Sequence, residues 1–277
     1  QPFNRTVFWK LKMLLFCNSF YNLLPFVRFE FRKRITTFLK GNVKKSPMNI
    51  GIIGAMDEEI AMYIPQIKNL KKEIYTIFTF YTGTFQGHPI VLVKSGVGKV
   101  FAAMVCQLLI DKYKIDYMLF TGVAGALNKT LEIGDVVVSV DSVHHDFDAT
   151  PLGFKRGQIS YTDYRYFQAE KKLLDLALTT KLKNHKIISG RILTGDQFFT
   201  HKDKQLHTYL IDELAGDCIE MEGAAVAQVC HVNKIPFLII RTVSDKADGT
   251  AVQDYNTFKE IIAVNSFTVC KEILRKL

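Results

Sequence analysis

The feature that most constrains the fold is a repeated alternation of strand-length apolar runs with helical patterns. An apolar run bounded by glycines comes first, at Asn49–Ala55, and a helix opens at Asp57. The runs predicted as strands are Pro89–Ser95, Tyr117–Thr121, Asp135–Val140, Lys186–Leu193 and Pro236–Val243. The segments predicted as helices are Lys99–Tyr113, Ala169–Leu182, Glu222–Val232 and Tyr255–Lys276. This alternation favours an α/β fold, a three-layer sandwich whose central sheet is mostly parallel or mixed.

Composition narrows the class of protein further. Of the 277 residues, 48% are hydrophobic and 23% are charged, which supports a packed core and excludes wholesale disorder. The sequence has no apolar run of membrane-spanning length, which argues against an integral membrane protein. Its five cysteines are scattered and form no C-x-x-C pair, so a disulfide framework is not expected. We therefore expect a reducing compartment, the cytoplasm.

The first 47 residues differ from the rest in charge. They carry ten basic residues and one acidic residue, so the net charge of +9 lies in this segment and residues 48–277 are balanced. We place a domain boundary at Pro47/Met48, between a basic, aromatic extension (1–47) and a folded domain (48–277). Arg32, Lys33 and Arg34 stand between apolar residues and form a compact patch for the sulfate or phosphate groups of a heparin-like polyanion. The alternatives are a solvated tail, a segment upstream of an initiator Met48, and an export or cell-surface signal.

Polar residues and glycines follow the predicted strands, where ligands of parallel sheets bind. The segments are Met56–Glu59, Ser95–Gly98, Gly122–Gly125, Gly195–Phe198, Glu220–Glu222 and Arg241–Asp245. Their convergence predicts a pocket for a small polar ligand with a flat ring. Glu59, Glu222 and Asp245 come from three of these segments, and cleavage of a glycosidic bond needs one acid and one base on opposite sides of a sugar. The alternative is that each carboxylate caps a helix or pairs with Arg241 or a lysine.

Other common site chemistries are disfavoured. Gly51–Gly54 lacks the dinucleotide spacing, and Gly96–Lys99 lacks the phosphate-loop spacing. His144 and His145 are adjacent and so point apart in a strand, which does not suit a metal site. No G-x-S-x-G motif indicates a serine hydrolase. We expect neither a cofactor nor a metal.

Six motifs resemble those of the bacterial 5′-methylthioadenosine/S-adenosylhomocysteine nucleosidases. They are Met48–Glu59 (MNIGIIGAMDEE), Ser95–Lys99 (SGVGK), Thr121–Gly125 (TGVAG), Leu131–Val137 (LEIGDVV), Glu220–Ala225 (EMEGAA) and Arg241–Asp248 (RTVSDKAD). They stand in the family's order across residues 48–277, and residues 1–47 lie outside the resemblance. It implies a nucleoside phosphorylase-like fold, a homodimer and hydrolysis of the bond between adenine and ribose. The implied substrates are 5′-methylthioadenosine, S-adenosylhomocysteine and 5′-deoxyadenosine.

The resemblance also implies roles for individual residues. Glu59 is the expected general base for the attacking water, and Asp245 is the expected general acid toward adenine. Ser244 would orient Asp245, and Arg241 would help hold the base and the water. The implied substrate-binding residues are Phe198, Phe199, Glu220, Met221, Glu222, Tyr255, Val123, Ala124 and Gly125.

Among these, Glu222 would bind the ribose diol, Met221 would pack against the sugar, and Phe198 would stack on adenine. The backbone of Phe199 would read the purine edge. Tyr255 stands near the ribose position, where family members usually have phenylalanine.

A phosphate-dependent purine nucleoside phosphorylase is the enzymatic alternative. Such enzymes place an arginine and a serine where this chain has Phe120 and Val123, and Ala126 replaces a glycine that is common in the family. Because neither Phe120 nor Val123 offers phosphate a charge or a hydroxyl, the resemblance favours water as the nucleophile.

Overall fold

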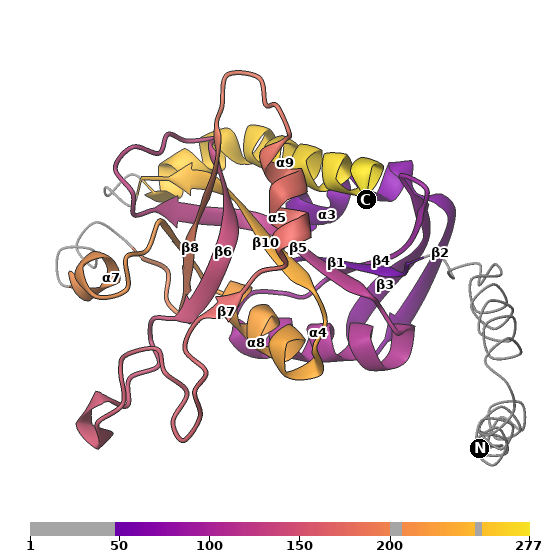
Figure 1. Ribbon diagram of the computed structural model, residues 1–277. Helices are drawn as coiled ribbons and strands as arrows, with labels where there is room; N and C mark the ends of the chain where they lie inside the picture. The colour runs from indigo at the N-terminus through magenta and orange to yellow at the C-terminus, as the bar shows by residue number, and fades with distance from the viewer. Residues whose placement is uncertain (1–47, 200–206, 247–250) are drawn as a thin grey trace, which may run out of the picture. The chain divides into compact units, whose positions relative to one another are not determined.

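The apolar runs of residues 48–277 pair into one mixed sheet with helices packed on both of its faces (Figure 1). The computed structural model describes residues 48–199, 207–246 and 251–277, with the backbone alone for 251–262. These residues belong to one compact unit, Pro47–Leu277. The extension, including the patch at Arg32, Lys33 and Arg34, lies outside the described residues. Its polyanion binding, its export signal and the cytoplasmic location stay predictions.

The sheet has ten strands, and their spatial order differs from their order in the chain. The strands are β1 (Ile50–Gly54), β2 (Lys68–Tyr75), β3 (Phe78–Phe85), β4 (His88–Lys94), β5 (Tyr117–Ala126), β6 (Val136–His144), β7 (Phe167–Gln168), β8 (Ile187–Thr194), β9 (Cys218–Glu220) and β10 (Phe237–Asp245). Their order across the sheet is β10-β6-β8-β9-β5-β1-β4-β3-β2, and β7 pairs with β6. Strand β1 runs parallel to β4 and β5, while β2, β3 and β4 form an antiparallel meander.

Part of this sheet closes on itself. Strand β10 pairs in parallel with β5 and antiparallel with β6, and β8 and β9 complete the ring. Closure brings the C-terminal halves of β5 and β10 side by side, with Gly122 opposite Arg241 and Gly125 opposite Asp245. Residues more than 100 positions apart in the chain thus share one end of the ring.

Helices cover the two faces of the sheet and form the outer layers of the sandwich. The helices are α3 (Asp57–Ala61), α4 (Lys99–Tyr113), α5 (Lys171–Leu178), α7 (Tyr209–Asp212), α8 (Gly223–Asn233) and α9 (Ala251–Lys276), with short 3₁₀ turns η2 (Ile64–Gln66) and η3 (Thr150–Leu152). Figure 1 shows α3, α5 and α9 on one face, and α4 and α8 on the other. An apolar cluster is buried between the sheet and the helices on each face. One cluster contains Leu109 and Val226, and the other contains Leu173 and Ile273. The predicted α/β sandwich with a mixed sheet is confirmed.

The structure also corrects several sequence-based expectations. The predicted helix Lys99–Tyr113 matches α4, but α5 is shorter than Ala169–Leu182. Strands β2, β3, β7 and β9 are absent from the sequence-based prediction. Gly122–Gly125 and Arg241–Asp245 were expected beyond strand ends, whereas they lie within β5 and β10, because the two strands continue pairing as far as Gly125 and Asp245.

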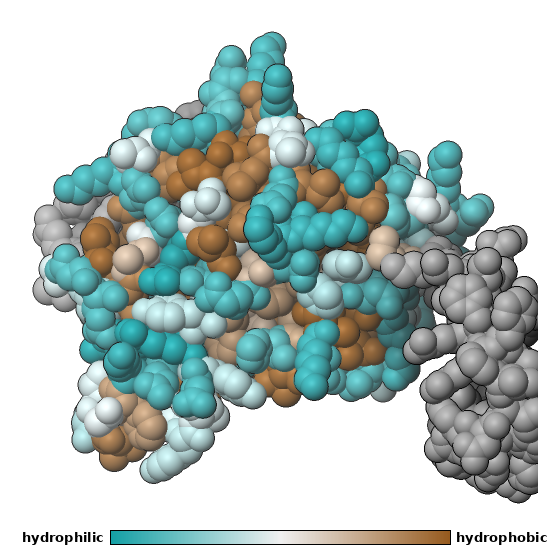
Figure 2. Space-filling view, viewed as in Figure 1, coloured by the Kyte–Doolittle hydropathy of each residue, from teal (hydrophilic) through white to brown (hydrophobic). Residues whose placement is uncertain are grey.

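The surface is mostly polar in the view of Figure 2, with apolar side chains at the tip of the loop that carries η3. Leu152 and Tyr161 of this loop are 68% and 86% exposed. Among the described helices, none combines the length and apolarity that crossing a membrane requires.

Candidate active site

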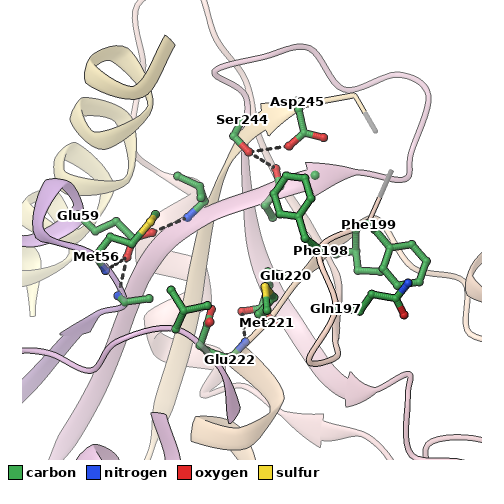
Figure 3. Close-up of a pocket in the computed structure, with 16 residues that line it drawn as sticks. Met56, Glu59, Gln197, Phe198, Phe199, Glu220, Met221, Glu222, Ser244 and Asp245 are labelled. Atoms are coloured by element: carbon green, nitrogen blue, oxygen red, sulfur yellow. Dashed lines mark hydrogen bonds between the residues drawn. The ribbon is translucent and has the colours of Figure 1, made fainter. Parts of the chain in front are cut away.

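A cavity of about 200 Å³ opens where the ends of β5 and β10 meet the start of α3, the segment after β8 and the β9–α8 junction (Figure 3). Its described lining residues are Ala55, Met56, Glu59, Val97, Val123, Ala124, Gly125, Gln197, Phe198, Phe199, Ile219, Glu220, Met221, Glu222, Ser244 and Asp245. The walls are mainly apolar, and carboxylates enter from three sides.

Glu59 is held at the start of α3 by backbone donors. Its Oε2 accepts hydrogen bonds from the N–H groups of Ala55 (2.5 Å) and Met56 (3.0 Å), and its Oε1 accepts one from Val123 (3.2 Å). Burial raises the pKa of the Glu59 carboxyl, while the nearby Arg241 and these N–H groups oppose that rise. A carboxylate with a raised pKa accepts a proton during a reaction more readily than one at its ordinary value.

Gly122 makes room for this carboxylate. A Cβ at position 122 would lie 2.9 Å from Glu59 Oε1 and 3.1 Å from Arg241 Nη1, so no larger residue fits without displacing a charged group. The lack of a side chain in the middle of β5 therefore sets how closely the base and the guanidinium approach.

Asp245 lies at the end of β10, where the pairing with β5 shifts. Val243 opposes Ala124 and Asp245 opposes Gly125, so Ser244 is the extra residue of a bulge. The Ser244 hydroxyl lies 2.9 Å from Asp245 Oδ2 and 3.3 Å from the Ala124 carbonyl oxygen. Both side chains are buried at the cavity wall, and the bulge re-aims them from the regular alternation of the strand (Figure 3).

The two glutamates of the β9–α8 junction have different surroundings. Glu220 is surrounded by donors: Arg241 (2.6 Å), the N–H groups of Glu222 (3.1 Å) and Gly223 (2.7 Å), and the Thr194 hydroxyl. Because its oxygens are already bonded to the protein, Glu220 serves to hold Arg241 and the start of α8 in place.

Glu222 has fewer partners than Glu220. Its Oε1 accepts a hydrogen bond from the Gly98 N–H (2.7 Å). Burial, reinforced by the charge of Glu220, raises the pKa of Glu222 to about 8. At neutral pH the carboxyl of Glu222 is therefore mostly protonated in the free protein.

Arg241 lies outside the described cavity lining. Its guanidinium is 1% exposed, stacks 4.0 Å from the Phe120 ring and donates to Glu220. Desolvation lowers its pKa, but Glu220, Glu59 and Glu222 outweigh that effect and raise it. Arg241 therefore acts on Glu59 through charge.

Two phenylalanines of the segment after β8 border the cavity differently. Phe198 is 54% exposed, whereas Phe199 is buried and packs edge-on against His145, with ring centroids 5.1 Å apart. Figure 3 shows the two rings pointing in different directions. Phe198 is therefore available to a flat ligand, and Phe199 anchors the segment.

The structure brings together most of the predicted site. Glu59, Asp245, Ser244 and the predicted binding residues line the cavity, apart from Tyr255, whose backbone lies in α9 and whose side chain is outside the described part of the chain. Met56, Val97 and Gln197 also line the cavity. The sequence motifs assign them no role, although they lie in the polar segments that indicate the site. Ala55 and Ile219 carried no sequence signal, because small and apolar residues in buried strands also serve the core.

Within the described ranges, no group of three or more His, Cys, Asp or Glu side chains is arranged to hold a metal ion. His144 and His145 differ in their partners: His144 Nε2 lies 3.0 Å from the Gln228 amide oxygen, and His145 Nδ1 lies 3.3 Å from the Tyr209 hydroxyl.

Comparisons with known proteins identify the family of this chain. Residues 49–275 match the family model described as the phosphorylase superfamily. A 5′-methylthioadenosine/S-adenosylhomocysteine nucleosidase of Hydrogenovibrio crunogenus is 40% identical over 235 residues, which cover 83% of this chain and 99% of that protein. The solved structure of such a nucleosidase from Colwellia psychrerythraea, in complex with adenine, has a TM-score of 0.79 and 34% identity, covering 84% of this chain and 96% of that one.

A futalosine hydrolase of Helicobacter pylori has a TM-score of 0.76 and 30% identity, covering 83% of this chain and 98% of that one. Family model and relatives each span most of residues 48–277 at identities that establish kinship. The chain belongs to the phosphorylase superfamily and, within it, to the 5′-methylthioadenosine/S-adenosylhomocysteine nucleosidases.

Proposed function

We propose that this protein hydrolyses the N-glycosidic bond of 5′-methylthioadenosine and S-adenosylhomocysteine, and also that of 5′-deoxyadenosine, releasing adenine. The observation that carries the proposal is that Glu59 and Asp245, from different ends of the domain, line one cavity together with Glu222. The names of the relatives and the adenine held by one of them support the same chemistry.

The reaction needs one acid and one base. Glu59 takes a proton from water as the water oxygen bonds to C1′ of the ribose. The C1′–N9 bond breaks, its electron pair leaves with adenine, and protonated Asp245 donates a proton to N7 of the base. The products are neutral adenine and the free 5′-substituted ribose, and solvent returns the proton from Glu59 to Asp245. Carboxylates close to C1′ stabilise the positive charge that develops there.

Binding uses the remaining lining residues. Phe198 stacks on adenine, the backbone of Phe199 reads the purine edge, and Met221 packs against the sugar. Hydroxyl groups both donate and accept hydrogen bonds, so the ribose diol can bind the carboxyl group of Glu222 in either protonation state. The place near the ribose that the resemblance implies for Tyr255 stays a prediction.

Water is favoured over phosphate as the nucleophile. Among the described residues that line the cavity none is Lys or Arg, and the nearby Arg241 is already bonded to Glu220. A phosphate dianion would therefore enter a site with a carboxylate at Glu59 and no cation facing it, which is unfavourable.

The test is adenine release from 5′-methylthioadenosine by the purified chain, with and without inorganic phosphate. We expect equal rates in both conditions and free 5-methylthioribose as the second product. A rate that requires phosphate, or a sugar phosphate as the product, would contradict hydrolysis. Futalosine serves as the competing substrate: a larger kcat/KM for it than for the thio-nucleosides would move the assignment to that activity.

We also propose that the protein works as a homodimer. Val97 lies just before α4, and Val100, Phe101 and Met104 follow on one side of the helix. All four side chains are 40–71% exposed. Val97 also lines the cavity, so a second copy seated on this face would border the site.

For the basic extension, the proposed partner is a heparin-like polyanion, supported by the ten basic residues among residues 1–47. We expect salt-sensitive retention on a heparin matrix that is lost when residues 1–47 are deleted. Equal retention of the truncated chain would contradict it.

A further inference from the structure

Two segments that face the cavity are tied together outside it. One is Ser95–Lys99, which leads into α4, and the other is Gly195–Phe199, which carries the two phenylalanines. The Lys99 N–H donates to Asp196 Oδ1 (2.9 Å), and the Lys99 ammonium lies 3.8 Å from Asp196 Oδ2. These contacts join positions 97 residues apart in the chain.

Asp146 completes the connection. Its carboxylate accepts from the Lys99 ammonium at 2.6 and 2.8 Å, and its Oδ2 also accepts from the Asp196 N–H at 3.0 Å. Asp146 directly follows His145, on which Phe199 packs. Each of Lys99, Asp146 and Asp196 therefore contacts the other two, and these contacts hold the Gly195–Phe199 segment on the base side of the cavity.

The residue next to Lys99 reaches the ribose side. The Gly98 N–H donates to Glu222 Oε1 at 2.7 Å, and the backbone at Gly98 has a φ of +100° that favours glycine. A Cβ there would lie 3.3 Å from Asp196 Oδ1, so the two segments meet closely. Gly98 thus holds the Glu222 carboxyl on the ribose side, and the next residue, Lys99, holds the Gly195–Phe199 segment on the base side.

We propose that Lys99 is a positioning residue that sets the spacing between Phe198 and Glu222, through Asp146 and Asp196. The inference rests on the proposed function, since it assigns the two sides of the cavity to base and ribose. Phe198 is half exposed, so little packing fixes its place, and the tether through Asp196 does so instead. A nucleoside spans both sides, and its affinity therefore depends on their separation.

The experiment compares Lys99→Met with Lys99→Arg and with Lys112→Met. Lys112 lies near the other end of α4, pairs with Glu73 at 2.8 Å and lies outside the described cavity lining, which makes it a matched control. We expect KM for 5′-methylthioadenosine to rise about tenfold in Lys99→Met, equivalent to about 1.4 kcal/mol of binding. We expect a rise of less than about twofold in Lys99→Arg and no change in Lys112→Met. Free adenine contacts only the Phe198 side, so its affinity measured by calorimetry should fall much less than KM rises.

A structural role alone would lower Tm in Lys99→Met while the folded enzyme kept its KM, and that result would overturn the inference. If Lys99→Met does not fold, Asp196→Ala removes the contacts between Lys99 and the Asp196 carboxylate, at a side chain that is 49% exposed, and an unchanged KM there would overturn the inference equally. Wild-type turnover is measured first, because a wild type that releases no adenine contradicts the proposed function and not the tether.

Discussion

At the scale of single residues, the site separates its carboxyl groups by their surroundings. Glu220 is neutralised by Arg241, Glu59 accepts three backbone N–H groups, and Glu222 accepts one while facing a like charge. Backbone donors favour the ionised form and burial favours the neutral form, so Glu59 remains a usable base. Different environments give similar side chains different tasks.

Replacing either member of the proposed acid–base pair tests these tasks. Glu59→Gln and Asp245→Asn keep the shape of each side chain but remove its proton transfer, so we expect adenine release to fall by about 100- to 10,000-fold in each. Thermal unfolding should show that both variants remain folded. Turnover close to wild type in either variant would refute the assigned role.

The raised pKa of Glu222 predicts how the free energy of unfolding depends on pH. Between the ordinary glutamate value and about pH 8, the folded chain keeps a proton on Glu222 that the unfolded chain releases. Its contribution to the free energy of unfolding is therefore fully present below pH 4.5 and is lost as pH rises toward 8, by up to about 1.4 kcal/mol per pH unit. Glu222→Gln lacks this loss.

Denaturant unfolding of both proteins at pH 5, 6, 7 and 8 measures the effect. The stability of Glu222→Gln relative to wild type should increase at each step. Parallel stability curves for the two proteins would show that Glu222 does not hold the proton.

At the scale of elements, the close approach of β5 to the base depends on a missing side chain. Gly122→Ala would bring a methyl group within 2.9 Å of Glu59 Oε1, and the carboxylate or β5 must shift. We expect kcat to fall about 10- to 100-fold, because small displacements of a catalytic group are costly.

Gly51→Ala is the matched control for this steric change. Its Cβ would lie 2.9 Å from the Ile115 side chain in the core, so it should lower Tm and leave kcat unchanged. Equal loss of kcat in both variants would show that the effect of Gly122→Ala is general destabilisation.

The elements predicted from the sequence are those whose pattern follows burial. Helix α4 has buried Ala102, Val105 and Leu109 on its inner side and was predicted at its observed bounds. Strand β2 is exposed along all eight residues, so no alternation marks it, and β9 has only three residues. Such elements are specified by the neighbouring strands with which they pair.

Within the site, the sequence identified the chemical groups but not their pairing. Arg241 bonds to Glu220 rather than to Glu222, two positions later, and the Glu222 carboxyl instead accepts from the Gly98 N–H. The contact of Gly98 with Glu222 joins residues 124 positions apart. Contacts of this range follow from the order of the strands across the sheet, which no local pattern encodes.

At the scale of the whole molecule, the exposed apolar face at the start of α4 stands out, because the described residues bury three apolar clusters elsewhere. A dimer that buries Val100, Phe101 and Met104 removes apolar surface from water, which stabilises association. Because the same apolar face appears in both copies of a symmetric dimer, like charges placed on it would confront each other.

Val100→Glu combined with Met104→Glu should therefore halve the mass measured by light scattering, from two chains to one. Ile74→Glu with Ile77→Glu is the control, since these side chains are 68% and 74% exposed on the β2 side of the sheet and should leave the dimer intact. Because Val97 both lines the cavity and belongs to the α4 face, the dissociated variant should also have a higher KM. A wild type with the mass of a single chain would rule out the dimer, and a monomeric variant with an unchanged KM would show that each cavity is complete within one chain.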